Sequence, residues 1–96
     1  MAESAFVSLR LYVAGDAQNS LAAVANLHDI CDRFLPDLHR IELVDVLREP
    51  GRALSDGVLM TPMLVKLAPL PMRKVVGSLS ETGVVLQALG LPALAA

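Results

Sequence analysis

Apolar and polar residues alternate at the start of the chain. The apolar positions of this stretch are Val7, Leu9, Leu11 and Val13. A repeat of two residues is typical of a strand that buries one face, so we predict a strand over residues 6–13. Gly15 follows it and is suited to the turn that ends the strand.

The spacing of apolar residues then changes to three and four. It is seen at Leu21, Val24, Leu27, Cys31 and Phe34. This spacing places the five side chains on one face of a helix, which we predict over residues 20–35. Ser20 or Asn19 would cap its start, and Pro36 would stop it. Asp29 and Arg33 are four residues apart and can pair on its exposed side.

Residues 41–46 predict a second strand. The segment is apolar on both faces in places, which favours an interior position in a sheet. Together with the preceding strand and helix it makes a βαβ unit. Pro50 is suited to the first position of a short helix over about 50–57, which Gly57 would close.

Two further strands are predicted after Thr61-Pro62, over residues 63–68 and 72–77. They join through Ala68-Pro69-Leu70-Pro71, a spacing that indicates a hairpin. Ser78 and Glu81 could form a capping box for a last helix. That helix would end at Gly90, with one face made by Val84, Val85, Ala88 and Leu89.

The C-terminal half allows a second interpretation. Residues 83–86 are β-branched enough for a strand, and residues 63–67 could join a helix. The favoured order is nevertheless βαβαββα, which predicts an α/β fold with a four-stranded mixed sheet and helices on both sides.

Composition narrows the class of protein. The chain has 96 residues, which fits a single domain over 1–96. Hydrophobic residues make up 54% of it, yet only three are aromatic, so its core must be aliphatic. This apolar excess favours a partner or self-association as a dimer or tetramer over a tightly packed monomer.

Charge and targeting signals exclude several functions. The net charge is −2 and no basic run is present, so nothing indicates nucleic-acid binding. No signal peptide is recognisable, and no apolar run approaches the roughly 18 residues that indicate a membrane span. A cytoplasmic protein is the simplest interpretation. With a single cysteine, the chain cannot form an internal disulfide.

Candidate chemistry is sparse. Cys31 lies on the apolar stripe of the first helix, which favours a buried structural thiol. His28, Cys31 and Asp32, with His39, could be considered as metal ligands, but zinc needs three or four well-placed ligands and Cys31 is committed to the core. No phosphate-binding glycine loop and no serine–histidine pairing is evident. We therefore expect no catalytic residue, no metal and no cofactor.

Several short motifs resemble one family when they are taken in order. The chain is similar to the KaiB family of circadian-clock proteins, and to the related sensor domain of the histidine kinase SasA, over about residues 6–91. The resemblance is carried by Leu11-Tyr12-Val13-Ala14-Gly15, Asn19-Ser20, Asp45-Val46-Leu47 with Pro50, Thr61-Pro62, and Pro69-Leu70-Pro71-Met72-Arg73-Lys74 with Gly77 and Leu79.

This resemblance implies a binding protein. KaiB proteins bind the ATPase ring of KaiC, recruit KaiA and compete with SasA. They also switch between a thioredoxin-like form that binds KaiC and a tetrameric form with a rearranged C-terminal half. Thioredoxin-like proteins carry a Cys-x-x-Cys where this chain has residues 15–20, which contain no cysteine. The resemblance also implies a cis peptide bond before Pro62.

The chain departs from the family pattern near its end. It has Ala88-Leu89-Gly90 where KaiB proteins typically carry Gly-Leu-Asp, and it lacks an acidic tail. Alanine favours helix over glycine by roughly 1 kcal/mol, so the thioredoxin-like form should dominate. The C-terminal tail lies outside the residues described structurally below.

The resemblance also implies an interaction surface. It maps the KaiC-binding half of the family onto Arg48, Arg52, Leu54, Lys66, Arg73 and Lys74. The leucine would supply affinity and the cations would orient an acidic partner. The function expected is a non-enzymatic adaptor for a KaiC-type ATPase in clock or stress signalling, with a KaiA-like protein or a histidine kinase as further partners. The alternatives are an oxidoreductase that uses Cys31 and the sensor domain of a two-component kinase.

Overall fold

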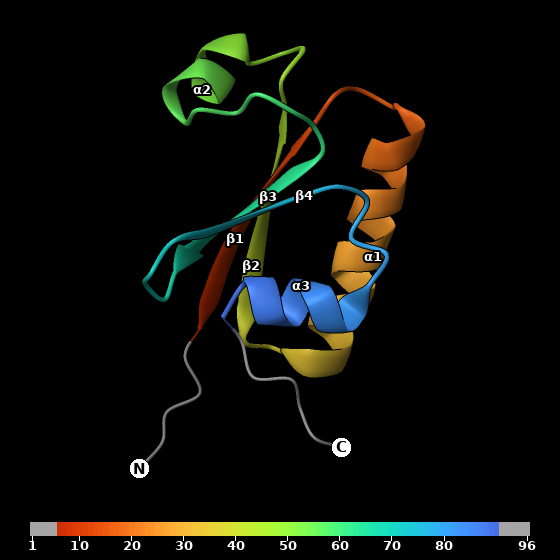
Figure 1. Cartoon of the computed structure of the whole chain (residues 1–96), viewed down its shortest axis with the longest axis vertical. Helices are drawn as coiled ribbons and strands as arrows, with labels where there is room; N and C mark the ends of the chain where they lie inside the picture. Colours follow the sequence, from red (N-terminus) through yellow and green to blue (C-terminus); the bar gives the residue numbers. More distant parts are fainter. Residues whose placement is uncertain (1–5, 91–96) are drawn as a thin grey trace.

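The computed structural model describes residues 6–90, which form one four-stranded sheet with three helices (Figure 1). The strand order is β2-β1-β3-β4; β1 and β2 run parallel and the other pairs run antiparallel. The predicted βαβαββα order and mixed sheet are confirmed. The elements are β1 (Val7–Val13), α1 (Gln18–Phe34), β2 (His39–Asp45), α2 (Pro50–Ser55), β3 (Met63–Ala68), β4 (Arg73–Val76) and α3 (Thr82–Ala88).

The position of β2 differs from the prediction. It lies at an edge of the sheet rather than in its interior. β2 has apolar residues on both faces because each face contacts a different cluster. Ile41 packs against the main core, and Val44 belongs to a smaller cluster on the opposite face. Leu43 remains 53% exposed. Apolar residues on both faces of β2 therefore indicate contact with two clusters and not an interior position in the sheet.

The main core lies between the sheet and the helices α1 and α3. Every second residue of β1 points into it, where it meets one stripe of α1 and one face of α3. The helical C-terminal segment confirms the thioredoxin-like arrangement predicted for this half. Members of this core include Leu9, Leu11, Leu27, Ile30, Leu64, Leu86 and Leu89.

Two details of the helix faces differ from the prediction. Leu21 is 57% exposed, because the buried stripe of α1 runs through Ala23, Leu27, Ile30 and Cys31 instead. In α3 the exposed fraction of Val84 is 58% and Ala88 is also exposed, since the helix turns Val85, Leu86 and Leu89 toward the sheet. The Asp29–Arg33 pair is confirmed, with 3.1 Å between Arg33 Nη1 and Asp29 Oδ2.

The predicted side-chain caps are wrong. The residue that caps α1 is Ala17, while Ser20 is buried in the first turn and its Oγ accepts a hydrogen bond from the Ala14 amide at 3.1 Å. Glu81 precedes α3 and makes no side-chain cap bond, so the box between Ser78 and Glu81 does not form. Ser20 serves instead to tie the helix start to the end of β1.

The second face of the sheet carries a smaller cluster, which consists of Tyr12, Val44, Met63 and Val65. Partly buried Val46, Val58 and Leu67 pack against it. In Figure 1, α2 lies beyond the end of the sheet opposite the N-terminus and covers little of this face. The Thr61–Pro62 peptide bond leading into β3 is cis, as expected, and the bonds before Pro69 and Pro71 are cis as well.

Candidate protein-interaction site

A shallow apolar groove lies beside α2. It has a volume of about 350 Å³ and is lined by Val46, Pro50, Ala53, Leu54, Val58, Leu59, Met60 and Thr61. Leu54 is 78% exposed and Leu59 is 89% exposed. Large aliphatic side chains this exposed and this close together are typical of a surface that binds another protein.

A network of ion pairs holds α2 to the sheet. Glu42 on β2 accepts from Arg10 Nε at 2.8 Å and pairs with Arg52 Nη2 of α2 at 2.9 Å. Arg10 also reaches Asp56, just after α2, at 3.1 Å. The hydrogen bond from Arg10, then that from Arg52, lowers the pKa of Glu42, and the bond to Glu42 raises the pKa of Arg10. Both groups are therefore held in their charged forms.

Asp45 organises the turn that leads into α2. Its Oδ1 accepts hydrogen bonds from the Gly15 amide at 3.0 Å and the Leu47 amide at 2.9 Å. These two bonds lower the pKa of Asp45, that from Gly15 most. Gly15 has a positive φ of 55°, which glycine adopts without strain. The carboxylate thus joins the end of β1 to the turn that presents Leu47 and Arg48 to solvent.

The structure gathers four of the six predicted interaction residues around α2. Arg52 and Leu54 belong to the helix, and Arg48 precedes it with a side chain that is 86% exposed. Lys74 of β4 approaches from the sheet, and its Nζ lies 3.4 Å from the Asp56 carbonyl oxygen. Of these four residues Leu54 lines the groove, while the three cations lie on or near α2 outside its lining.

The other two predicted residues lie on the opposite face of the sheet. Lys66 and Arg73 are paired across β3 and β4, and both approach the end of α3 beside Gly90. Lys66 is only 2% exposed, and its burial, followed by the charge of Arg73, lowers its pKa. The six residues therefore do not form one continuous surface, because neighbours along a strand point to opposite faces.

Sequence reasoning missed three exposed residues of the candidate interaction site. Leu47 is 71% exposed, and Leu59 and Met60 line the groove between α2 and β3. They lie outside the periodic segments, so no pattern of burial pointed to them. The available signal was their place in the turns on either side of α2, where apolar residues have no core to fill.

The residues considered for chemistry do not assemble into a site. Cys31 is 1% exposed, and burial raises the pKa of its thiol to about 11. Over residues 6–90 no group of three histidine, cysteine or acidic side chains could hold a metal ion. No helix within this range is long and apolar enough to cross a membrane.

Known proteins are similar to this chain in sequence and in fold. The family description that matches residues 10–91 is the KaiB domain. The circadian clock protein KaiB3 of Synechocystis sp. is 38% identical over 85 residues, which cover 88% of this chain and 83% of that protein.

Solved structures support the fold alone, because their identities are low. The N-terminal domain of Synechococcus elongatus SasA superposes with a TM-score of 0.73 at 19% identity, covering 94% of this chain and 89% of that domain. Mitochondrial thioredoxin 3 of Saccharomyces cerevisiae has a TM-score of 0.71 at 14% identity, with 91% and 79% covered. The fold is thus thioredoxin-like, and by sequence the chain belongs to the KaiB family.

Proposed function

We propose that this protein is a non-enzymatic adaptor that binds a KaiC-type ATPase through the surface around α2, in clock or stress signalling. The observation that carries this proposal is the groove beside α2, which is lined by the exposed residues Leu54 and Leu59. Arg48 lies in the turn before this helix and Arg52 lies within it. Membership of the KaiB family supports the choice of partner.

The exposed leucines would supply most of the affinity. Burying a fully exposed leucine contributes about 1.5–3 kcal/mol, so Leu54 and Leu59 together could anchor a complex. Arg52 is already fixed by Glu42 and Glu49, which limits the entropy it loses on binding. Arg48 makes a long ion pair of 3.9 Å with Asp45 and its side chain is 86% exposed, so its charge would mainly speed encounter with an acidic partner.

Substitution of Leu54 tests the apolar part of the surface. We expect Leu54→Ala to weaken binding to a purified KaiC-type ATPase on the order of tenfold, measured by biolayer interferometry. Leu21→Ala is the matched control, because Leu21 is also exposed but lies on α1 away from the groove. Equal affinities for wild type and Leu54→Ala would contradict the assignment of this groove.

Charge reversal separates the two faces of the sheet. Lys74 lies near α2, whereas Arg73 points to the opposite face beside α3. We therefore expect Lys74→Glu to weaken binding more than Arg73→Glu, and salt to reduce the difference. The reverse order would move the interface to the Lys66 and Arg73 side.

An oxidoreductase is the alternative from another class. A redox cysteine needs an accessible thiolate, whereas Cys31 is buried and its pKa is raised to about 11. We expect no insulin reduction by the wild type or by Cys31→Ser. Turnover that depends on Cys31 would replace the adaptor proposal.

The shared fold of the SasA N-terminal domain supports a second binding role, that of a sensor domain of a histidine kinase. We also propose a KaiA-like protein as a further partner and a dimer or tetramer in solution.

Self-association is supported by the exposed apolar surface. Eleven large hydrophobic side chains remain exposed over residues 6–90. Light scattering coupled to size-exclusion chromatography would give the oligomeric state directly.

A further inference from the structure

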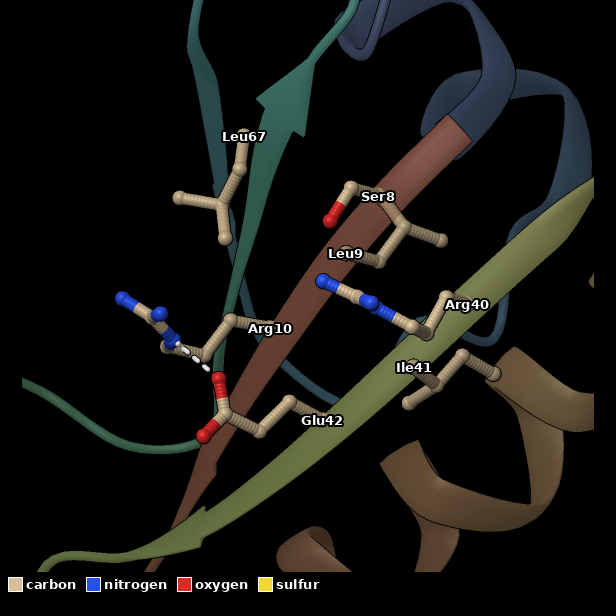
Figure 2. Close-up of a pocket in the computed structure, with 7 residues that line it drawn as sticks. All are labelled: Ser8, Leu9, Arg10, Arg40, Ile41, Glu42 and Leu67. Atoms are coloured by element: carbon tan, nitrogen blue, oxygen red, sulfur yellow. Dashed lines mark hydrogen bonds and ion pairs between the residues drawn. The ribbon is translucent and has the colours of Figure 1, made fainter. Parts of the chain in front are cut away.

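The face of the sheet opposite α1 and α3 is open at the end away from α2. A hollow of about 430 Å³ lies there, over β1, β2 and β3 (Figure 2). Its lining residues are Ser8, Leu9, Arg10, Arg40, Ile41, Glu42 and Leu67. None of the residues assigned to the interaction surface around α2 contributes to this hollow.

The register of β1 and β2 pairs the polar residues of the hollow across the two strands. Ser8 faces Arg40 across β1 and β2, and Arg10 faces Glu42 one step further along. Paired positions on neighbouring strands point to the same face and lie about 5 Å apart. The register therefore brings two arginines, one carboxylate and one hydroxyl onto the same open surface.

Arg40 takes no part in the ion pairs of this surface within residues 6–90. Glu42 is bound by Arg10 and Arg52, and Arg10 is bound again by Asp56. Within residues 6–90 no carboxylate pairs with Arg40, which is exposed. Arg10 and Arg52 both bind Glu42 and screen its charge from an anion beside Arg40, although the same two arginines also pair with Asp56 and Glu49.

Ser8 adds a second donor next to this cation. Figure 2 shows the Arg40 side chain reaching from β2 across β1 toward Ser8, with Leu67 on the far side of the hollow. No hydrogen bond within the described part of the chain engages the Ser8 hydroxyl or the Arg40 guanidinium. The Ser8 hydroxyl and the Arg40 guanidinium can both donate, and they lie on the same side of the sheet as the Leu67 side chain.

We propose that this hollow binds a small carboxylate ligand with a short aliphatic chain. The planar guanidinium of Arg40 matches a carboxylate through two parallel hydrogen bonds, and the Ser8 hydroxyl can donate a third. The Leu67 side chain offers an apolar contact to the chain of the ligand, as expected for a site in which a few polar groups set the orientation of a ligand. This site is separate from the protein-binding role of the α2 surface.

Titration with butyrate, followed by amide and methyl NMR at constant ionic strength, tests the site. We expect saturable shifts centred on Ser8, Arg40 and Leu67, with a dissociation constant in the millimolar range. Butyramide has the same chain without the charge and should give no saturable shift. In Arg40→Gln the butyrate affinity should fall by roughly tenfold or more, because the bidentate partner is lost.

Arg33→Gln is the matched control, since Arg33 is also exposed but lies on α1 away from the hollow. It should bind butyrate like the wild type. Non-saturating shifts, equal responses to butyrate and butyramide, or unchanged affinity in Arg40→Gln would overturn the proposal. Tighter binding of inorganic phosphate than of butyrate would also overturn the assignment to a carboxylate.

Discussion

The two faces of the sheet differ in the residues that they carry. The face toward α1 and α3 buries a continuous aliphatic core, in which Leu9, Leu11 and Leu64 are almost fully hidden. The opposite face has only the small cluster around Tyr12 and Val44 and is crossed by ion pairs. The exposed residues Leu54 and Leu59, the apolar groove beside α2 and the polar hollow over β1 and β2 occur on or beside this second face.

This difference separates stability from binding. The main core gains its free energy from apolar burial, which needs no particular partner orientation. On the opposite face, ion pairs that hold α2 in place occupy part of the surface, and some apolar side chains remain exposed. Changes in the first face should therefore affect folding, and exposed changes on the second should affect binding.

Leu64→Ala should give the largest effect on stability. Leu64 is 0% exposed in the main core, and such truncations cost about 2–5 kcal/mol, because a cavity remains. Leu54→Ala on the α2 side should change the free energy of unfolding by no more than about 0.5 kcal/mol, because Leu54 is exposed. Urea denaturation measures both, and similar losses would remove the distinction between the two faces.

Tyr12→Phe should have a smaller effect and the opposite sign. The hydroxyl of Tyr12 is buried in the small cluster and has no hydrogen-bond partner within the described residues. Removing an unsatisfied buried polar group should raise the free energy of unfolding by about 1 kcal/mol. Tyr12→Leu is the control for lost packing and should destabilise, and a loss of stability in Tyr12→Phe would show that the hydroxyl is satisfied in solution.

Acid should weaken the attachment of the α2 turn, with the smallest effect of the three. Hydrogen bonds lower the pKa of Asp45 in the folded state, so its contribution is fully present above the ordinary carboxyl value of about 4. It is lost as the pH falls through the lowered folded-state pKa.

In Asp45→Asn, which cannot titrate, the melting temperature should therefore decline less over that acidic range than in the wild type. Thermal denaturation followed by circular dichroism measures this. Parallel declines in the two proteins would show that Asp45 does not contribute to the acid sensitivity.

The sequence predicted the elements well, because their periodicity reflects one-sided burial. β3 was expected over residues 63–68 and runs over Met63–Ala68. The predicted helix caps are wrong because Ser20 and Ser78 resemble caps only in the local sequence. The Ser20 hydroxyl accepts from the Ala14 amide instead, and Glu81 rather than Ser78 occupies the position before α3. The edge position of β2 was missed because two separate clusters give it apolar residues on both faces.

The interaction site was only partly accessible to sequence reasoning. The resemblance to KaiB pointed to Arg48, Arg52 and Leu54, and these residues lie in α2 or in the turn before it. It grouped Lys66 with them, although that side chain lies buried on the other face. Proximity along the chain could not reveal this, since alternate residues of a strand face opposite sides of the sheet.

By itself the sequence determined the order of the elements, the aliphatic character of the core and the family. These depend on local periodicity and on ordered motifs, which can be read along one dimension. Only the tertiary structure decided which cations share a surface and which are left without a partner. That outcome depends on strand register and on contacts such as Arg10 with Asp56, 46 residues apart, that no local pattern encodes.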